Sequence, residues 1–134
     1  MKVLLDTNII LDIALNRQPH VEHSARLLDT PEKKLTFYIT ASSITDIYYI
    51  TKKQLQHDTA IEFILDLLKF CEVCPQLKSV FQKAAQSKFK DFEDAVQYFC
   101  AEKAEVDAII TRNQKDFSES ALPVYSPQEF IDQL

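Results

Sequence analysis

Four aspartates in this chain follow an expected strand or open an expected helix: Asp6, Asp46, Asp94 and Asp116. Carboxylates that lie close together repel one another and raise each other's pKa, so a cluster of them usually needs a divalent cation. Because no histidine or cysteine lies near them in the sequence, hard ions such as Mg²⁺ or Mn²⁺ match an all-oxygen site. One or two such ions bind phosphate oxygens and activate water for in-line attack on a phosphodiester.

The expected strands place three of these acids at one rim. Residues 3–5 are apolar without alternation, which is typical of a strand buried on both faces of a parallel sheet, and Asp6 follows directly. Asp46 lies in the first turns of the helix after the second strand, and Asp116 follows the fourth strand. Ligands of open α/β sheets bind at the carboxyl ends of the strands. Asp94 joins this rim only if the helix pair between strands three and four turns back there.

Taken singly, most of these acids also have a structural interpretation. Asp91 is an expected N-cap with Asp94 three positions on, and Ser43 with Asp46 is nearly a capping box. Asp116 could cap a turn. The joint pattern of four acids is what favours a metal site over a set of unrelated caps.

Alternating segments predict strands and helices in turn. The expected strands are Lys2–Leu5, Leu35–Thr40, Cys71–Cys74, Ala108–Thr111 and Leu122–Tyr125. The expected helices begin after Thr7 or Asn8, at His20, at Ser42 or Ser43, at Asp58, after Pro75, at Asp91 and after Ser126, with a short turn or helix over 113–117. This order predicts an α/β fold with a parallel sheet between helices, and Pro123 requires an edge position for the last strand.

Apolar periodicity predicts the packing faces of two helices. In the helix from Asp58 to Phe70 the expected stripe is Ile61, Ile64, Leu65 and Leu68. In the helix from Asp91 to Lys103 the expected inward residues are Phe92, Ala95, Val96, Phe99 and Cys100.

Composition excludes several classes of protein. A chain of 134 residues is expected to form one domain, and its three cysteines do not indicate a disulfide framework. The chain has no glycine, so Walker loops, dinucleotide fingerprints and G-x-S-x-G elbows are excluded. Its net charge of −5 disfavours a broad basic surface for nucleic acid. No apolar stretch is long enough for a membrane span and no signal peptide is visible, so a cytoplasmic location is expected.

Four segments in order, spanning nearly the whole chain, are similar to the motifs of a known family: Leu4–Asn8, Ser42–Tyr49, Asp91–Ala95 and Ile110–Phe117. Together they resemble PIN-domain proteins, and most of all the VapC-type toxin ribonucleases of bacterial toxin–antitoxin pairs. The resemblance implies one PIN-like domain over residues 1–134. It also implies a three-layer α/β/α fold whose central five-stranded parallel sheet has the order 3-2-1-4-5.

The same resemblance assigns roles to the acids. Asp6, Asp94, Asp116 and Asp46 would be catalytic and would hold Mg²⁺ or Mn²⁺. The family's second acid is more often Glu, so Asp46 is one methylene shorter than the pattern. The supporting residues would be Asn8 beside the first acid, Thr111 and Asn113 as hydrogen-bonding groups, and Asp91 and Glu93 beside Asp94, with Asp91 as the helix cap.

The activity that the resemblance implies is metal-dependent endonucleolytic cleavage of RNA. The implied partners are a small antitoxin protein and a second copy of the chain in a homodimer. Two alternatives stay open. One is a PIN-like interaction module without activity. The other is a receiver-type Mg²⁺-binding signalling domain, which would require an Asp after strand three and a Lys after strand five. Neither residue is present in Cys71–Pro75 or Val124–Pro127.

Overall fold

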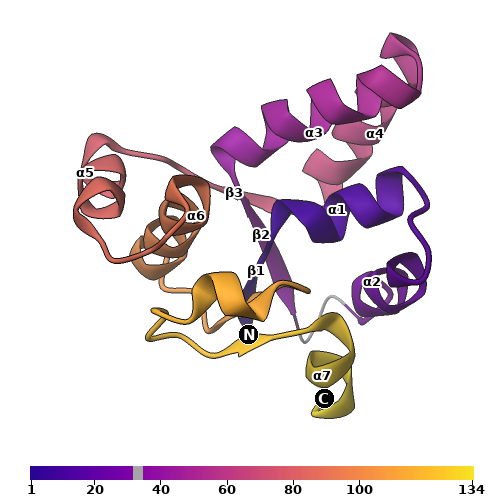
Figure 1. Cartoon of the computed structure of the whole chain (residues 1–134). Helices are drawn as coiled ribbons and strands as arrows, with labels where there is room; N and C mark the ends of the chain where they lie inside the picture. Colours follow the sequence, from indigo (N-terminus) through magenta and orange to yellow (C-terminus); the bar gives the residue numbers. More distant parts are fainter. Residues whose placement is uncertain (32–34) are drawn as a thin grey trace.

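The computed structural model describes residues 1–31 and 35–134. Its strands form a five-stranded sheet in the order β3-β2-β1-β4-β5, and every neighbouring pair is parallel. The predicted strand order and three-layer α/β/α fold are therefore confirmed (Figure 1). The strands are β1 (Lys2–Leu5), β2 (Thr36–Thr40), β3 (Glu72–Cys74), β4 (Ala108–Ile110) and β5 (Val124–Tyr125).

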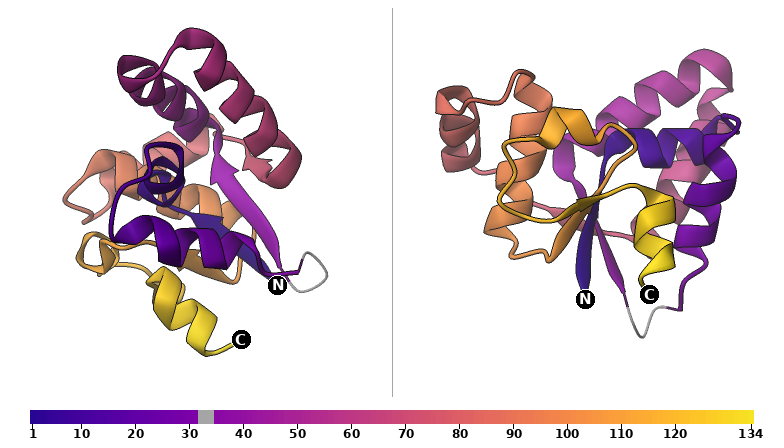
Figure 2. Two further views of the ribbon diagram at one scale, coloured as in Figure 1. Left: turned by 90° about the vertical axis from the view of Figure 1, so that its right-hand side faces the viewer. Right: turned by 60° about the horizontal axis from the view of Figure 1, so that its bottom comes forward.

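Helices cover both faces of this sheet. One face packs against α1 (Thr7–Ala14), α2 (His20–Leu28), α3 (Ala41–Gln54), α4 (His57–Phe70) and α7 (Pro127–Asp132). The other face packs against α5 (Lys78–Gln86), α6 (Phe92–Lys103) and the 3-10 turn η1 (Gln114–Phe117). Figure 2 shows α5 and α6 on the side of the sheet opposite α1 and α2.

The central strand β1 explains why the apolar run of the sequence lacks alternation. Val3 and Leu5 belong to the core on the α1 side, whereas Leu4 belongs to the core on the α6 side. All three side chains are fully buried, and each contributes roughly 1.5–3 kcal/mol relative to an exposed position. β1 therefore has a single favourable place in the middle of the sheet, and this fixes the position of Asp6 at its carboxyl end.

The edge position predicted for the last strand from Pro123 is also confirmed.

Two of the expected helix caps are confirmed and one is wrong. Asp91 Oδ1 accepts a hydrogen bond from the Asp94 N–H at 2.9 Å, and Ser126 Oγ accepts one from the Glu129 N–H at 3.2 Å. Neither Ser42 nor Ser43 caps α3, because that helix begins earlier, at Ala41, with Thr40 as N-cap.

The expected packing faces of α4 and α6 need correction. On α4, Ile61, Leu65 and Leu68 are 38%, 55% and 44% exposed, while Ala60 and Leu67 are buried. The helix carries two apolar stripes that share Ile64. The stripe that packs inward has Phe63 and Ile64 against the core beside Leu67, so of the predicted stripe only Ile64 is confirmed. On α6, Phe92 is 54% exposed and contacts the ring of Phe81 instead of entering the core.

The three cysteines, Cys71, Cys74 and Cys100, are buried free thiols. Burial raises the pKa of Cys71 and Cys74 to about 12, and that of Cys100 to about 11. They are core residues, in agreement with the sequence, which offered no disulfide framework. Within the described residues, no helix has the length and apolar character needed to cross a membrane.

Candidate active site

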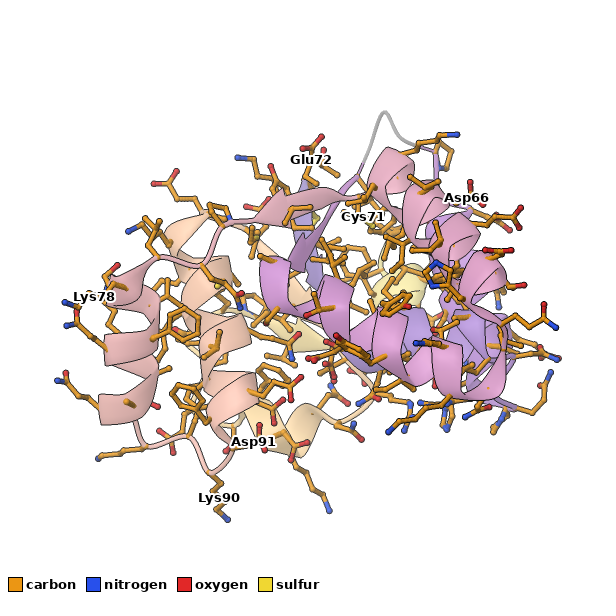
Figure 3. All side chains as sticks on the ribbon, turned by 90° about the horizontal axis from the view of Figure 1, so that it is seen from above. Asp66, Cys71, Glu72, Lys78, Lys90 and Asp91 are labelled. Carbon is orange, nitrogen blue, oxygen red and sulfur yellow. The ribbon has the colours of Figure 1, made fainter. Side chains whose placement is uncertain are left out.

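One pocket of about 430 Å³ brings the four predicted aspartates together at the carboxyl edge of the sheet. α6 begins at this edge, with Asp91 at its start (Figure 3), so the condition on which Asp94 depended is met. We call this the acidic pocket. Its polar lining consists of Asp6, Thr7, Asn8, Asp46, Asp91, Glu93, Asp94, Gln97 and Asp116.

Asp6 is the most firmly held of the four. Asp6 is buried, with only 4% of the residue exposed. Thr111 Oγ1 donates to Asp6 Oδ2 at 2.7 Å, and Gln97 Nε2 donates to Asp6 Oδ1 at 3.1 Å. The backbone N–H of Asn113 in turn donates to Thr111 Oγ1 at 3.0 Å. Both carboxylate oxygens therefore have fixed directions before any ligand arrives.

A buried chain of hydroxyl groups connects the first and second acidic segments. Thr7 Oγ1 lies 2.7 Å from Ser43 Oγ, which lies 2.7 Å from Thr40 Oγ1. These bonds join the start of α1 to the start of α3. They thereby fix Asn8 and Asp46, which follow in those two helices, at the same pocket.

The acidic pocket raises the pKa of Asp94. Burial of its carboxyl raises this pKa from 3.8 to about 7, and the negative charges of Asp91, Asp6, Asp116 and Glu93 add to the rise. Asp91 and Glu93 belong to the start of α6, like Asp94 itself, whereas Asp6 and Asp116 come from distant parts of the sequence. Three of the four acidic segments, those of Asp6, Asp94 and Asp116, are therefore close enough for their charges to act on one carboxyl group.

Glu93 shows the same crowding on the Asp46 side. Burial raises the pKa of Glu93, and the charge of Asp46, a hydrogen bond with the Asp46 carboxylate, and the charges of Asp91 and Asp6 raise it further. Asp46, although one methylene shorter than Glu, therefore lies within hydrogen-bonding reach of another acid of the pocket.

The donor set fits a hard divalent cation in its chemistry. It consists of carboxylate oxygens held in a partly buried pocket, where burial and then the neighbouring negative charges raise the pKa of Asp94 and Glu93. Across residues 1–31 and 35–134, no group of three or more His, Cys, Asp or Glu side chains is arranged closely enough to hold a metal ion.

Sequence reasoning missed Gln97, which donates to Asp6. Its spacing could have found it, because Gln97 lies three residues after Asp94 and so faces the same side of α6. It also missed Thr7, whose hydroxyl contacts Ser43, and this contact has no local sequence signal.

Comparison with known proteins identifies the family. The family model described as "PIN domain" matches residues 2–115 of this chain. The chain belongs to the PIN domain family. It is similar to "Ribonuclease VapC1" of Aquifex aeolicus (strain VF5). The two sequences are 28% identical over an aligned length of 137 residues, which covers 98% of this chain and 94% of the relative.

Solved structures share the fold of this PIN domain. It is similar to VapBC-1 from nontypeable Haemophilus influenzae, with a TM-score of 0.74, 16% identity, and coverage of 96% of this chain and 99% of that chain. It is also similar to a toxin–antitoxin complex from Klebsiella pneumoniae, with a TM-score of 0.69, 21% identity, and coverage of 93% and 97%.

Proposed function

We propose that this PIN domain is a Mg²⁺- or Mn²⁺-dependent endoribonuclease and the toxin of a toxin–antitoxin pair. The observation that carries the proposal is the acidic pocket, where aspartates from four separate segments meet at the carboxyl edge of the sheet. A cluster of this kind does not stabilise the fold on its own, because burial and the neighbouring negative charges raise the pKa of Asp94 and Glu93.

Asp6, Asp94, Asp116 and Asp46 are the residues that would hold the ion. When bound, a divalent ion supplies positive charge and Lewis acidity for hydrolysis of a phosphodiester. Thr111 and Gln97 keep the Asp6 oxygens directed, which reduces the reorganisation that ligand binding requires. Asp94 holds a proton at its carboxyl below about pH 7 in the absence of an ion, so protons compete with the cation for this residue.

The names of the relatives support RNA as substrate and a protein as partner. A relative that covers nearly the whole chain is named a ribonuclease, and a structural neighbour is a toxin–antitoxin complex. We extend both properties to this chain, with a small antitoxin protein as partner and a homodimer as assembly. Membership of the PIN family argues against the receiver-type alternative, whereas an inactive PIN-like module remains the competing hypothesis.

Cleavage of a labelled RNA tests the proposal. We expect purified protein to cut the RNA with Mn²⁺ or Mg²⁺, to stop in EDTA, and to recover when the ion is restored. Asp6→Asn should abolish cleavage while circular dichroism shows a folded protein. Asp58→Asn is the matched control, because Asp58 is an exposed aspartate at the start of α4, outside the acidic pocket.

Full cleavage by Asp6→Asn would overturn the site, and absence of cleavage by folded wild-type protein with either ion would favour the inactive module. Expression of the chain in a bacterium tests the toxin role. Growth should stop with the wild type and continue with Asp6→Asn, and co-expression of the small protein encoded next to it should restore growth.

A further inference from the structure

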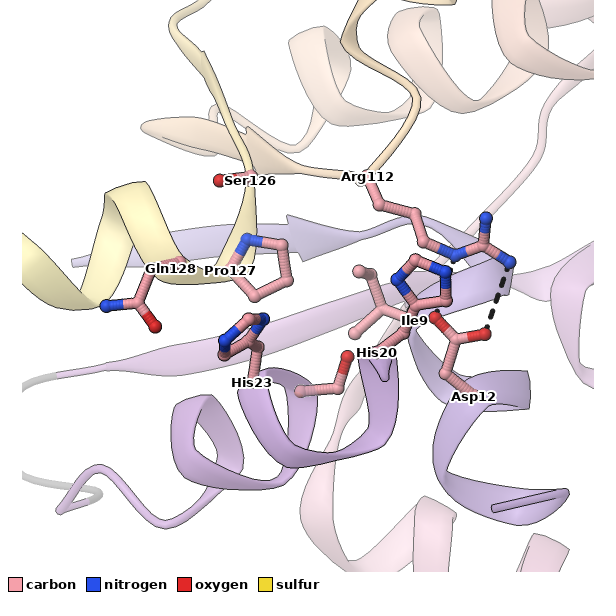
Figure 4. A pocket seen from close by; sticks show the side chains of 9 residues that line it. Ile9, Asp12, His20, His23, Arg112, Ser126, Pro127 and Gln128 are labelled. Atoms are coloured by element: carbon pink, nitrogen blue, oxygen red, sulfur yellow. Dashed lines mark hydrogen bonds and ion pairs between the residues drawn. The ribbon is translucent and has the colours of Figure 1, made fainter. Parts of the chain in front are cut away.

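A second pocket, of about 250 Å³, lies between α1, α2, Arg112, which is the second residue after β4, and the start of α7 (Figure 4). We call it the basic pocket. Asp12 is the one acidic residue among the described residues that line it. The other polar side chains on which its chemistry depends are His20, His23, Ser24, Arg112 and Gln128.

Arg112 is held rigidly at this pocket by Asp12. Arg112 Nε donates to Asp12 Oδ2 at 2.9 Å and Nη2 donates to Oδ1 at 3.3 Å, and Asp12 is completely buried. A guanidinium carries five N–H groups in a planar fork, so this pairing leaves three of them available. Asp12 also pairs with Arg17 Nη1 at 3.7 Å. One carboxylate therefore faces two guanidinium groups, and one positive charge is left over.

Ser24 supplies an unused hydrogen-bonding group. The residue is 1% exposed, and its Oγ makes no hydrogen bond in the described part of the chain. A buried hydroxyl without a partner lowers stability, because it has lost its bonds to water and gained none in return. Ser24 lines the basic pocket, so a ligand in the pocket is placed to supply the missing partner.

The remaining side chains also favour an anion. His20 and His23 each carry at least one imidazole N–H donor in any protonation state. His20 is the first residue of α2, a helix of nine residues, and the N-terminal end of a helix carries partial positive charge. Together with Arg112 and Ser24, these groups surround the pocket with hydrogen-bond donors. Phosphate oxygens accept hydrogen bonds from donors of this kind.

The basic pocket adjoins the acidic pocket. Arg112 follows Thr111, whose hydroxyl holds Asp6, so the two residues lie about 3.8 Å apart along the backbone. On α1, Asn8 lines the acidic pocket and Ile9 and Asp12 line the basic one. The two pockets thus flank the same helix, whose width is about 10–12 Å including side chains.

We propose that the basic pocket binds a single phosphate group. Its source is either an RNA strand that continues from the acidic pocket or a free phosphate monoester. The RNA source rests on the function proposed above, whereas the phosphate chemistry of the pocket does not. Ser24, Arg112 and His20 are the residues that contact the phosphate.

A titration with inorganic phosphate at constant ionic strength, followed by NMR of the ¹⁵N-labelled protein, tests the site. We expect saturable shifts at residues 20–24 and 112. Ser24→Ala should weaken binding about tenfold, the loss of one hydrogen bond to a charged group, while the melting temperature stays level or rises. Thr51→Val is the matched control, because Thr51 carries another buried hydroxyl without a partner, on α3 and outside the pocket. Equal phosphate affinity in these two variants, or no saturable shift, would overturn the proposal.

A short RNA distinguishes the two sources. Its affinity is measured for Asp6→Asn and for the double variant Asp6→Asn with Ser24→Ala. A roughly tenfold loss in the double variant identifies the RNA strand as the source, and unchanged RNA affinity with weakened phosphate binding identifies a free monoester. The two proposals fail separately. A protein that binds phosphate at residues 20–24 but cuts no RNA refutes the ribonuclease alone, and one that cuts RNA without this binding refutes the basic pocket alone.

Discussion

Replacing Asp94 by Asn should stabilise the metal-free protein at high pH. The folded state raises the pKa of Asp94 from 3.8 to about 7, a difference of about three pKa units. At about 1.36 kcal/mol for each unit, the upper limit of the cost of ionising this group is about 4 kcal/mol. Asp94 is only half-buried, so solvent screening reduces the expected gain to roughly 1–2 kcal/mol.

The sign of the pH dependence follows from proton binding. Between about pH 4 and pH 7 the folded state keeps a proton on Asp94 that the unfolded state releases, so the free energy of unfolding falls as pH rises. Asn does not titrate. The gain from Asp94→Asn is therefore close to zero near pH 4, roughly a third of its full value at pH 5, and complete above about pH 7.

Thermal unfolding in EDTA measures this effect. For a domain of this size we expect Asp94→Asn to raise the melting temperature by roughly 3–8 °C at pH 8 and by much less at pH 5. Asp58→Asn, outside the pocket, should give the same small change at both pH values. A lower melting temperature for Asp94→Asn at pH 8, or an equal shift at pH 5 and pH 8, would refute the idea that crowded carboxylates oppose folding here.

Three further predictions concern the groups around the two pockets. Thr111→Val removes the 2.7 Å donor to the buried Asp6 and should lower the free energy of unfolding by roughly 1–3 kcal/mol in urea; an unchanged value would show that this bond does not hold Asp6. Arg112→Gln leaves the fully buried Asp12 with Arg17 alone and should cost roughly 3–5 kcal/mol in the same measurement, whereas a loss below about 1 kcal/mol would contradict a rigid pairing. Because burial raises the pKa of Cys71 and Cys74 to about 12, iodoacetamide should alkylate them, as followed by mass spectrometry, only after urea unfolds the protein.

Much of the fold could be predicted because its strands carry unambiguous local patterns. The apolar residues 3–5 favour a strand buried on both faces of a parallel sheet, and β1 is indeed the central strand, with Asp6 at its carboxyl end. The strand order came from the resemblance of the motifs, since apolar patterns alone do not specify which strands are neighbours. Ser43 shows the limit of local rules. It has the type and position of a cap, yet its hydroxyl contacts Thr7, 36 residues earlier.

Those features of the site that depend on residue types could be predicted from the sequence. Those that depend on tertiary contacts could not. Carboxylates after strands indicate the acidic pocket, which does bring the four predicted aspartates together. Gln97 was missed although its helical spacing from Asp94 was visible. The pairing of Asp12 with Arg112 spans 100 residues, and nothing in either local sequence specifies it. Likewise, the two apolar stripes of α4 can be told apart only once α4 is packed.

The central claim is that the acidic pocket is a divalent cation site, and direct measurement of Mn²⁺ binding tests it most closely. Free Mn²⁺, followed by its electron paramagnetic resonance signal, should fall on addition of wild-type protein and of Asp58→Asn. Asp6→Asn and Asp94→Asn should each bind Mn²⁺ at least tenfold more weakly, because each removes a charged oxygen ligand. Equal Mn²⁺ affinity in all four proteins would contradict the account.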